Sequence, residues 1–101
     1  MIKDTVFEKD GTSLTVRPVG PLDTATSPIL QEKLEPEMDG VTDLVLDFAD
    51  VEYISSGGLR LLLLTEQEME NRKGMLTVTH VNDHVRSILD MSGFLTILKV
   101  V

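Results

Sequence analysis

The sequence contains no cysteine and only two histidines, which removes several kinds of functional site at once. Without cysteine the chain can form no disulfide bond, no thiol nucleophile and no zinc–thiolate centre. The two histidines, His80 and His84, are four residues apart, a spacing that could place both on one face of a helix. Because His80 is expected at the end of a strand, we expect no metal site, and no residue pattern indicates a cofactor.

Long apolar segments are missing as well. The longest run is four leucines, Leu61 to Leu64, whereas a transmembrane helix needs about 20 apolar residues. The first eleven residues lack the basic start, apolar middle and small-residue cleavage site of a signal peptide. We therefore expect a cytoplasmic protein without direct membrane insertion.

Positive charge is scarce. Nine Lys and Arg residues stand against 17 Asp and Glu residues, which gives a net charge of −8 at pH 7. Such a surface repels nucleic acids and anionic lipids unless a local basic patch is present, and the only adjacent basic pair is Arg72 and Lys73. We expect the partners to be proteins or small molecules, and no nucleic acid.

The first half of the chain predicts a hairpin, a helix and a strand. Asp10-Gly11 separates two β-rich segments, which is a strong signal for a β-hairpin. Residues 24–40 have the apolar spacing of a helix, with Pro28 in its first turn and a stop near Leu34, because Pro36 removes a backbone hydrogen bond. Residues 43–48 lack polar alternation, which predicts a strand covered on both faces.

The second half predicts two more helices and two more strands. A helix is expected over 59–74, a strand over 75–81, a second helix opened by Asn82 or Asp83, and a short edge strand over 97–101. We expect Val85, Ile88, Leu89 and either Met91 or Ser92 to form the buried side of that last helix. The whole order predicts one α/β domain over 1–101, with helices on a mixed sheet that has a parallel core and an N-terminal hairpin.

The most informative segment is Ile54-Ser-Ser-Gly-Gly-Leu59, between a buried region and the leucine-rich helix. It fits no Walker loop, because no lysine follows the glycines, and no nucleophile elbow, because no glycine precedes the serine. We therefore predict no catalytic residue here and no enzyme. Two interpretations stay open: a serine that caps the helix beside glycines that turn the chain, or a serine hydroxyl that is modified.

The helix after this segment bears on the second interpretation. At 100° per residue, Leu59, Leu62 and Leu63 share a face that can cover the sheet, while Leu61 and Leu64 point away from it. An apolar patch beside a modifiable serine is typical of a surface that binds a protein partner.

Three segments, residues 19–34, 43–63 and 85–98, together resemble the STAS domains of bacterial anti-sigma factor antagonists, and the similarity spans about 12–101. In this family the loop reads Asp-Ser-Ser-Gly-Leu, and its first serine accepts a phosphate. That serine corresponds to Ser56. The family's acidic residue corresponds to Ser55, which is the second candidate for phosphorylation, and its second serine corresponds to Gly57.

The resemblance also implies a set of residues that bind the partner. The Asp of the family's first segment corresponds to Asp23, and the Asp that ends the central strand corresponds to Asp47, both expected beside the loop. We expect the following residues to contact the partner: Asp23, Thr24, Ser55, Gly57, Gly58, Leu59, Leu61 and Leu64.

The mechanism implied by the resemblance is partner switching. The unphosphorylated protein binds an anti-sigma factor of the GHKL serine-kinase type and releases a sigma factor. Phosphorylation stops this binding, and a phosphatase of the PP2C type restores it, so ATP and Mg²⁺ belong to the kinase. The alternative is a stand-alone STAS subunit of a lipid or anion transporter, with the same fold but no phosphorylated serine.

Overall fold

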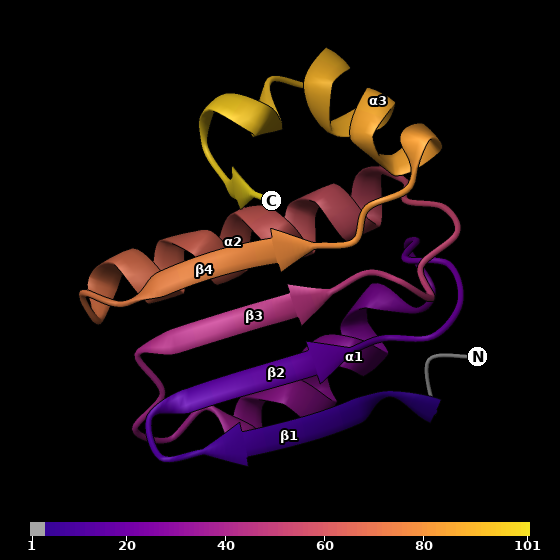
Figure 1. Ribbon diagram of the computed structural model, residues 1–101. Helices are drawn as coiled ribbons and strands as arrows, with labels where there is room; N and C mark the ends of the chain where they lie inside the picture. Colours follow the sequence, from indigo (N-terminus) through magenta and orange to yellow (C-terminus); the bar gives the residue numbers. More distant parts are fainter. Residues whose placement is uncertain (1–3) are drawn as a thin grey trace.

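The computed structural model describes residues 4–101, and residues 1–3, the start of the segment in which no signal peptide is expected, lie outside it. Five strands form one sheet in the order β1-β2-β3-β4-β5, in which β1 runs antiparallel to β2 and the other neighbours are parallel (Figure 1). The elements are β1 Val6–Asp10, β2 Ser13–Arg17, α1 Ser27–Leu34, η2 Glu35–Glu37, β3 Asp43–Asp47, α2 Ser56–Asn71, β4 Met75–Thr79, α3 Asp83–Met91, η3 Phe94–Thr96 and β5 Lys99–Val100. The predicted mixed sheet with a parallel core is confirmed.

The N-terminal hairpin forms where it is predicted, with its turn one residue later. Asp10 pairs with Ser13, so the turn consists of Gly11 and Thr12. Gly11 has a φ of +63°, a left-handed conformation that glycine adopts without steric penalty. Asp10 therefore ends β1 and is not part of the turn.

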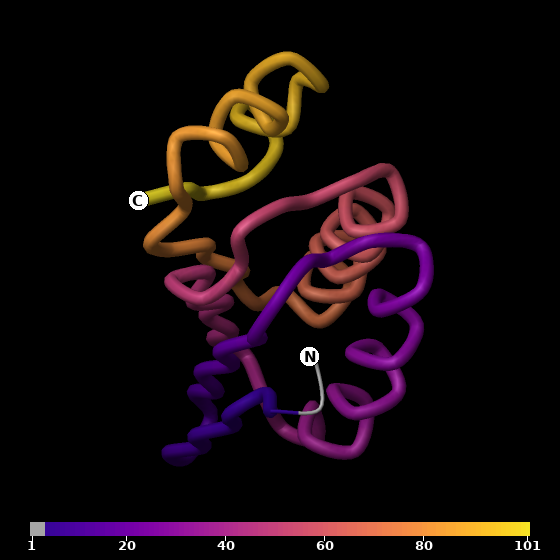
Figure 2. The backbone as a smooth tube through the Cα atoms, turned by 90° about the vertical axis from the view of Figure 1, so that its right-hand side faces the viewer, coloured from indigo at the N-terminus to yellow at the C-terminus, as the bar shows by residue number. Residues whose placement is uncertain are grey.

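Within residues 4–101, helices cover only one face of the central strands. Helices α1 and α2 both lie on this face, side by side (Figures 1 and 2). Six strand residues on it are at most 2% exposed: Leu14, Val16, Leu44, Leu46, Leu76 and Val78. On the other face the central row is half-buried Thr15, Val45 and Thr77. The prediction that β3 is covered on both faces is therefore wrong, because α1 and α2, the helices that connect β3 to its two neighbouring strands, pack on the same side.

The ends of α1 and α3 follow the local sequence signals. Pro28 lies in the first turn of α1, and the helix stops at Leu34, two residues before Pro36. A 3₁₀ turn follows from Glu35. The Asn82 side chain caps α3 by accepting a hydrogen bond of 2.7 Å from the Val85 amide. These predictions are confirmed.

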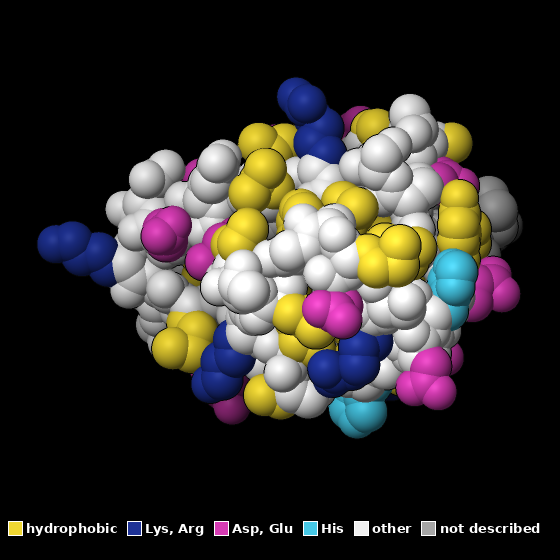
Figure 3. Space-filling model, turned by 90° about the horizontal axis from the view of Figure 1, so that it is seen from above, with side chains coloured by type: hydrophobic (Ala, Val, Ile, Leu, Met, Phe, Trp, Pro, Cys, Tyr) yellow, Lys and Arg dark blue, Asp and Glu magenta, His cyan; other side chains and the backbone are white. Residues whose placement is uncertain are grey.

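The face formed by α3 and the C-terminal segment shows hydrophobic side chains in separate patches, with charged side chains between them (Figure 3). Met91 is 82% exposed, so neither it nor the exposed Ser92 extends the buried side of α3, which consists of Val85 and Leu89. That part of the prediction is wrong because Met91 lies on the far side of α3 from Val85 and Leu89, and Ser92 follows the last residue of the helix. Within residues 4–101, no helix is long and apolar enough to cross a membrane.

Asp47 ends β3 as an almost fully buried carboxylate. It accepts two hydrogen bonds from the Arg17 guanidinium, at 3.1 and 3.2 Å, and one of 3.0 Å from the Ala49 amide. His80 Nδ1 lies 3.1 Å from Oδ1, the same oxygen that accepts from the Ala49 amide, whereas Arg17 donates to Oδ2. Burial alone would raise the pKa of Asp47, but the Ala49 amide, Arg17 and His80 outweigh it and lower the pKa below 3.8. Asp47 thus closes an Asx turn and links β2, β3 and the end of β4.

Replacing Asp47 with asparagine is expected to lower the free energy of unfolding by about 1–2 kcal/mol at neutral pH, because charge-assisted hydrogen bonds are lost. The lowered pKa means that Asp47 stabilises the fold fully above 3.8 and loses this effect as the pH falls through its folded value. In thermal melts, the difference from wild type should therefore shrink in acid. Asp43→Asn, an exposed position on the same strand, is the control and should change little. A difference for Asp47→Asn that stays constant with pH would contradict this role.

Candidate functional site

The serine segment and the segment before α1 lie next to each other at the edge where the parallel strands end (Figure 2). The Leu22 amide donates a hydrogen bond of 3.0 Å to the Tyr53 carbonyl, and the Ser55 amide donates one of 2.9 Å to the Leu22 carbonyl. These bonds hold residues 22–24 against residues 53–57. The structure thus brings together two groups of predicted site residues that are about thirty positions apart in the sequence.

Ser55 and Ser56 occupy different positions at the start of α2. Ser55 is the half-buried N-cap residue, with extended backbone angles, and its carbonyl accepts a hydrogen bond of 2.9 Å from the Leu59 amide. In the part of the chain that the structure describes, its hydroxyl caps no helix amide. Ser56 is the first helical residue and is exposed. Its hydroxyl is therefore the more accessible of the two, beside the positive end of a 16-residue helix.

Gly57 and Gly58 are helical residues that allow a close contact, and they do not form a turn. A Cβ atom on Gly57 would lie 2.6 Å from the Thr24 Cα, and one on Gly58 would lie 2.7 Å from the Leu22 carbonyl oxygen. Neither glycine has a positive φ. The expectation that the glycines turn the chain is therefore wrong. Gly58 is also buried, and its role in partner binding stays a prediction.

Asp23 shapes the loop before α1. Its carboxylate accepts hydrogen bonds of 2.9 Å from the Ala25 and Thr26 amides, and the Thr26 hydroxyl donates to the Pro21 carbonyl at 2.8 Å. The Thr26 amide is the main cause that lowers the pKa of Asp23, so the carboxylate is ionised at neutral pH. Thr24, next to it, is exposed. The role of Asp23 and Thr24 in partner binding stays a prediction.

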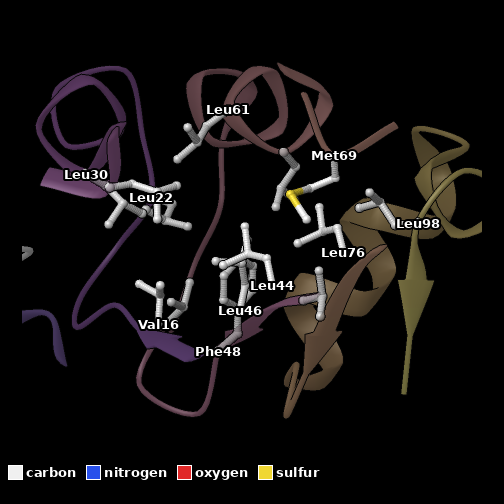
Figure 4. Packing of buried hydrophobic residues seen from close by; sticks show 14 of the residues in the cluster. Val16, Leu22, Leu30, Leu44, Leu46, Phe48, Leu61, Met69, Leu76 and Leu98 are labelled. Atoms are coloured by element: carbon white, nitrogen blue, oxygen red, sulfur yellow. The ribbon is translucent and has the colours of Figure 1, made fainter. Parts of the chain in front are cut away.

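The buried side of α2 differs from the predicted one. It consists of Gly58, Leu61, Leu62, Thr65 and Met69, and Leu61 is only 4% exposed. Figure 4 shows Leu61 directed into the core toward Leu22. The prediction that Leu61 points away from the core is therefore wrong, whereas Leu64, 38% exposed, does lie on the surface.

The cause of this error is that two of the inward-facing residues are not strongly apolar. Thr65 is buried because its hydroxyl donates a hydrogen bond of 2.7 Å to the Leu61 carbonyl inside the helix. Gly58 lies on the same side because only glycine fits against Leu22 and Ile54. Leu59 and Leu63 flank this side and are half-buried.

Two hollows lie between α1 and α2. The larger, about 520 Å³, is lined by residues of α1, η2 and α2 that include Leu34, Glu35, Leu64 and Glu68. The smaller, about 140 Å³, lies at the N-terminal ends of both helices, where Thr24, Ser27, Gly57 and Arg60 line it. Neither Ser27 nor Arg60 is among the predicted site residues. Arg60 follows Ser56 by four residues, a spacing that places both on one side of a helix, and this was the available signal.

The fold and this loop define a STAS domain. Residues 5–101 match the STAS domain family, and the chain belongs to that family. Among its relatives, BtrV of Bordetella bronchiseptica, which is classed with the anti-sigma factor antagonists, is 35% identical over 82 residues. These residues cover 80% of this chain and 71% of BtrV.

Solved structures show the same fold. A Thermotoga maritima protein classed with the anti-sigma factor antagonists superposes with a TM-score of 0.89 at 17% identity, covering 95% of this chain and 84% of that one. The anti-sigma factor antagonist SpoIIAA in its unphosphorylated form gives a TM-score of 0.75 at 18% identity, over 96% and 86% of the two chains. SpoIIAA of Bacillus in its phosphorylated form gives 0.73 at 19% identity, over 96% and 90%. At these identities the likeness establishes the fold.

Proposed function

We propose that the protein is an anti-sigma factor antagonist that acts as a binding module and is switched by phosphorylation of Ser56. The observation that carries this proposal is the position of Ser56, an exposed hydroxyl on the first residue of α2, in a chain 35% identical to BtrV. The unphosphorylated protein binds an anti-sigma factor of the GHKL serine-kinase type, and a sigma factor is released. Because sigma factors act on RNA polymerase, the site of action is the cytoplasm.

The switch is a phosphoryl transfer and its reversal by hydrolysis. The kinase moves the γ-phosphoryl group of ATP to the Ser56 oxygen, the hydroxyl proton passes to a base of the kinase, and ADP leaves. A PP2C-type phosphatase then adds water across the phosphoester bond, which restores the hydroxyl and releases inorganic phosphate. The substrate nucleotide and Mg²⁺ are bound by the kinase, and this chain contributes only the acceptor hydroxyl.

Because of the position of Ser56, a phosphate on its hydroxyl affects the stability of the fold and the binding of the partner in different ways. A phosphate adds about 1.5 to 2 negative charges at pH 7, and the free amides and dipole of a helix N-terminus favour a negative charge there by about 0.3–1 kcal/mol. In a protein interface the same dianion loses its hydration, at a cost of several kcal/mol when it is unpaired. The phosphorylated chain therefore stays folded but no longer binds. SpoIIAA has the same fold in its unphosphorylated and phosphorylated forms, which supports the expectation that the chain stays folded.

The assignment of the phosphate to Ser56 is testable on a phosphate-affinity gel. Incubated with its kinase and ATP, the wild-type chain should give one shifted band, Ser56→Ala should give none, and Ser55→Ala should keep the shift, because Ser56 is exposed and Ser55 is half-buried. Ser87→Ala, an exposed serine on α3, is the control and should shift like wild type. A shift that persists in Ser56→Ala and disappears in Ser55→Ala would move the assignment to Ser55.

A further inference from the structure

The smaller hollow between α1 and α2 has the properties of a site for one negative group. Thr24, Ser27, Gln31 and the backbone of Gly57 provide polar groups, and Arg60 is the only charged residue among the eight that line it. Acidic residues are absent from this lining, although the chain as a whole carries a net charge of −8. The first turns of α1 and α2 both border the hollow, so the positive ends of two helices lie beside it.

Ser27 provides an independent indication of a ligand. It is 5% exposed, and among the described residues 4–101 its hydroxyl oxygen is the one buried side-chain polar atom without a hydrogen-bond partner. Buried polar groups are otherwise almost always paired, because an unpaired one destabilises the fold. A hydroxyl that lines a hollow and has no partner is available to donate to an oxygen atom that enters it.

Arg60 is equally available. Its side chain is exposed, and within the described part of the chain it takes part in no hydrogen bond or ion pair, whereas Arg17 and Arg72 are held by Asp47 and Glu68. A free guanidinium beside a helix N-terminus is suited to bind a carboxylate or a phosphate.

We propose that this hollow binds the carboxylate of an Asp or Glu side chain of the protein partner. A single guanidinium with neutral donors balances one negative charge, which favours a carboxylate over a phosphate dianion. Pro28, Leu61 and Leu64 form the rest of the lining and suit the apolar stem of such a side chain. This inference rests on the proposed function, because it names the chemistry by which the partner is bound.

Arg60 also explains how phosphorylation of Ser56 prevents binding of the partner. Arg60 follows Ser56 by four residues in α2, so their side chains are neighbours on the helix surface. A phosphate on Ser56 would pair with Arg60 and repel the incoming carboxylate. Arg60 thus binds the carboxylate of the partner when Ser56 is unphosphorylated, and binds the phosphate when Ser56 is phosphorylated.

The binding site is tested by NMR titration of the full chain with acetate, and with acetamide as the neutral probe of similar shape, at constant ionic strength. Acetate should shift the Gly57 and Gly58 amide signals to saturation, and acetamide should not. Arg60→Gln should weaken acetate binding about tenfold. Arg86→Gln, which removes the same charge from an exposed position on α3, should bind like wild type. Equal shifts in the two variants, or with acetamide, would overturn the site.

Ser27→Ala gives a second test, in which stability and binding change in opposite directions. Removing an unpaired buried hydroxyl should raise the melting temperature by a few degrees, while acetate binding weakens severalfold. A lower melting temperature with unchanged acetate binding would show that Ser27 is a structural residue and would overturn its role.

The outcomes separate this proposal from the proposed function. If Ser56 is phosphorylated by the kinase but acetate does not bind, the carboxylate site is wrong and the switch stands. If acetate binds in wild type and the Ser56→Asp chain binds it more than tenfold more weakly, the link between Ser56 and Arg60 is supported. Equal acetate binding by these two chains would overturn that link, whether or not a kinase modifies Ser56.

Discussion

We expect Ser56→Asp to weaken binding to the anti-sigma factor by at least a hundredfold and to leave the melting temperature unchanged or slightly raised. The added carboxylate lies on the first residue of α2, where the helix dipole favours it by about 0.3–1 kcal/mol. In the interface it must lose its hydration beside a partner surface that is adapted to a neutral hydroxyl. That loss of several kcal/mol exceeds the roughly 2.7 kcal/mol that a hundredfold change in affinity requires.

Calorimetric titration with the anti-sigma factor and thermal melts of the same samples measure the two effects. Ser87→Asp, on the exposed side of α3, adds the same charge outside the loop and should bind within a few-fold of wild type. This control matters because the chain already carries a net charge of −8, and an extra carboxylate weakens association with any acidic partner. Equal affinities for Ser56→Asp and Ser87→Asp would contradict the switch.

The sequence predicted the order of helices and strands because each has a local cause. The hairpin depends on Gly11, the stop of α1 on Pro36 and the start of α3 on Asn82, and these residues act on their own backbone. The STAS resemblance placed Asp23 and Ser56 in one site, and the structure does bring their segments together through the bonds of Leu22.

What the sequence could not predict depends on contacts between distant segments. The four consecutive leucines of α2 fit several buried sides equally well, and the true side is selected by Gly58 and Thr65, which hydrophobicity does not identify. The open face of β3 follows from the side on which α1 and α2, the helices that connect it to its neighbours, pack. Ser27 and Arg60 line the same hollow only because α1 and α2 pack side by side, and the sequence does not predict this contact.

We expect Gly57→Ala to disturb both the fold and the site. Alanine is normally preferred in a helix by about 1 kcal/mol, but here its Cβ would lie 2.6 Å from the Thr24 Cα and 2.8 Å from the Asp23 carbonyl carbon. These are backbone atoms, so α2 and the loop before α1 must separate. Overpacking of this kind typically costs 1–3 kcal/mol. Because the clash is with backbone atoms, we expect the upper part of this range, about 2–3 kcal/mol. After the helix preference of alanine is subtracted, the net loss is about 1–2 kcal/mol, which corresponds to roughly 5–10 °C in melting temperature.

The matched control for Gly57→Ala is Gly11→Ala, in the hairpin turn at the opposite end of the sheet (Figure 1). Its Cβ would meet no atom within 4 Å, but its φ of +63° is strained for alanine by about 1–2 kcal/mol. Both variants should therefore melt earlier by similar amounts in thermal scans. Only Gly57→Ala should also weaken binding to the anti-sigma factor and slow the phosphorylation of Ser56, because only there does the strain move the loop that carries the serine. A Gly57→Ala chain that melts like wild type would mean that α2 and residues 23–24 are not in the close contact that aligns the site.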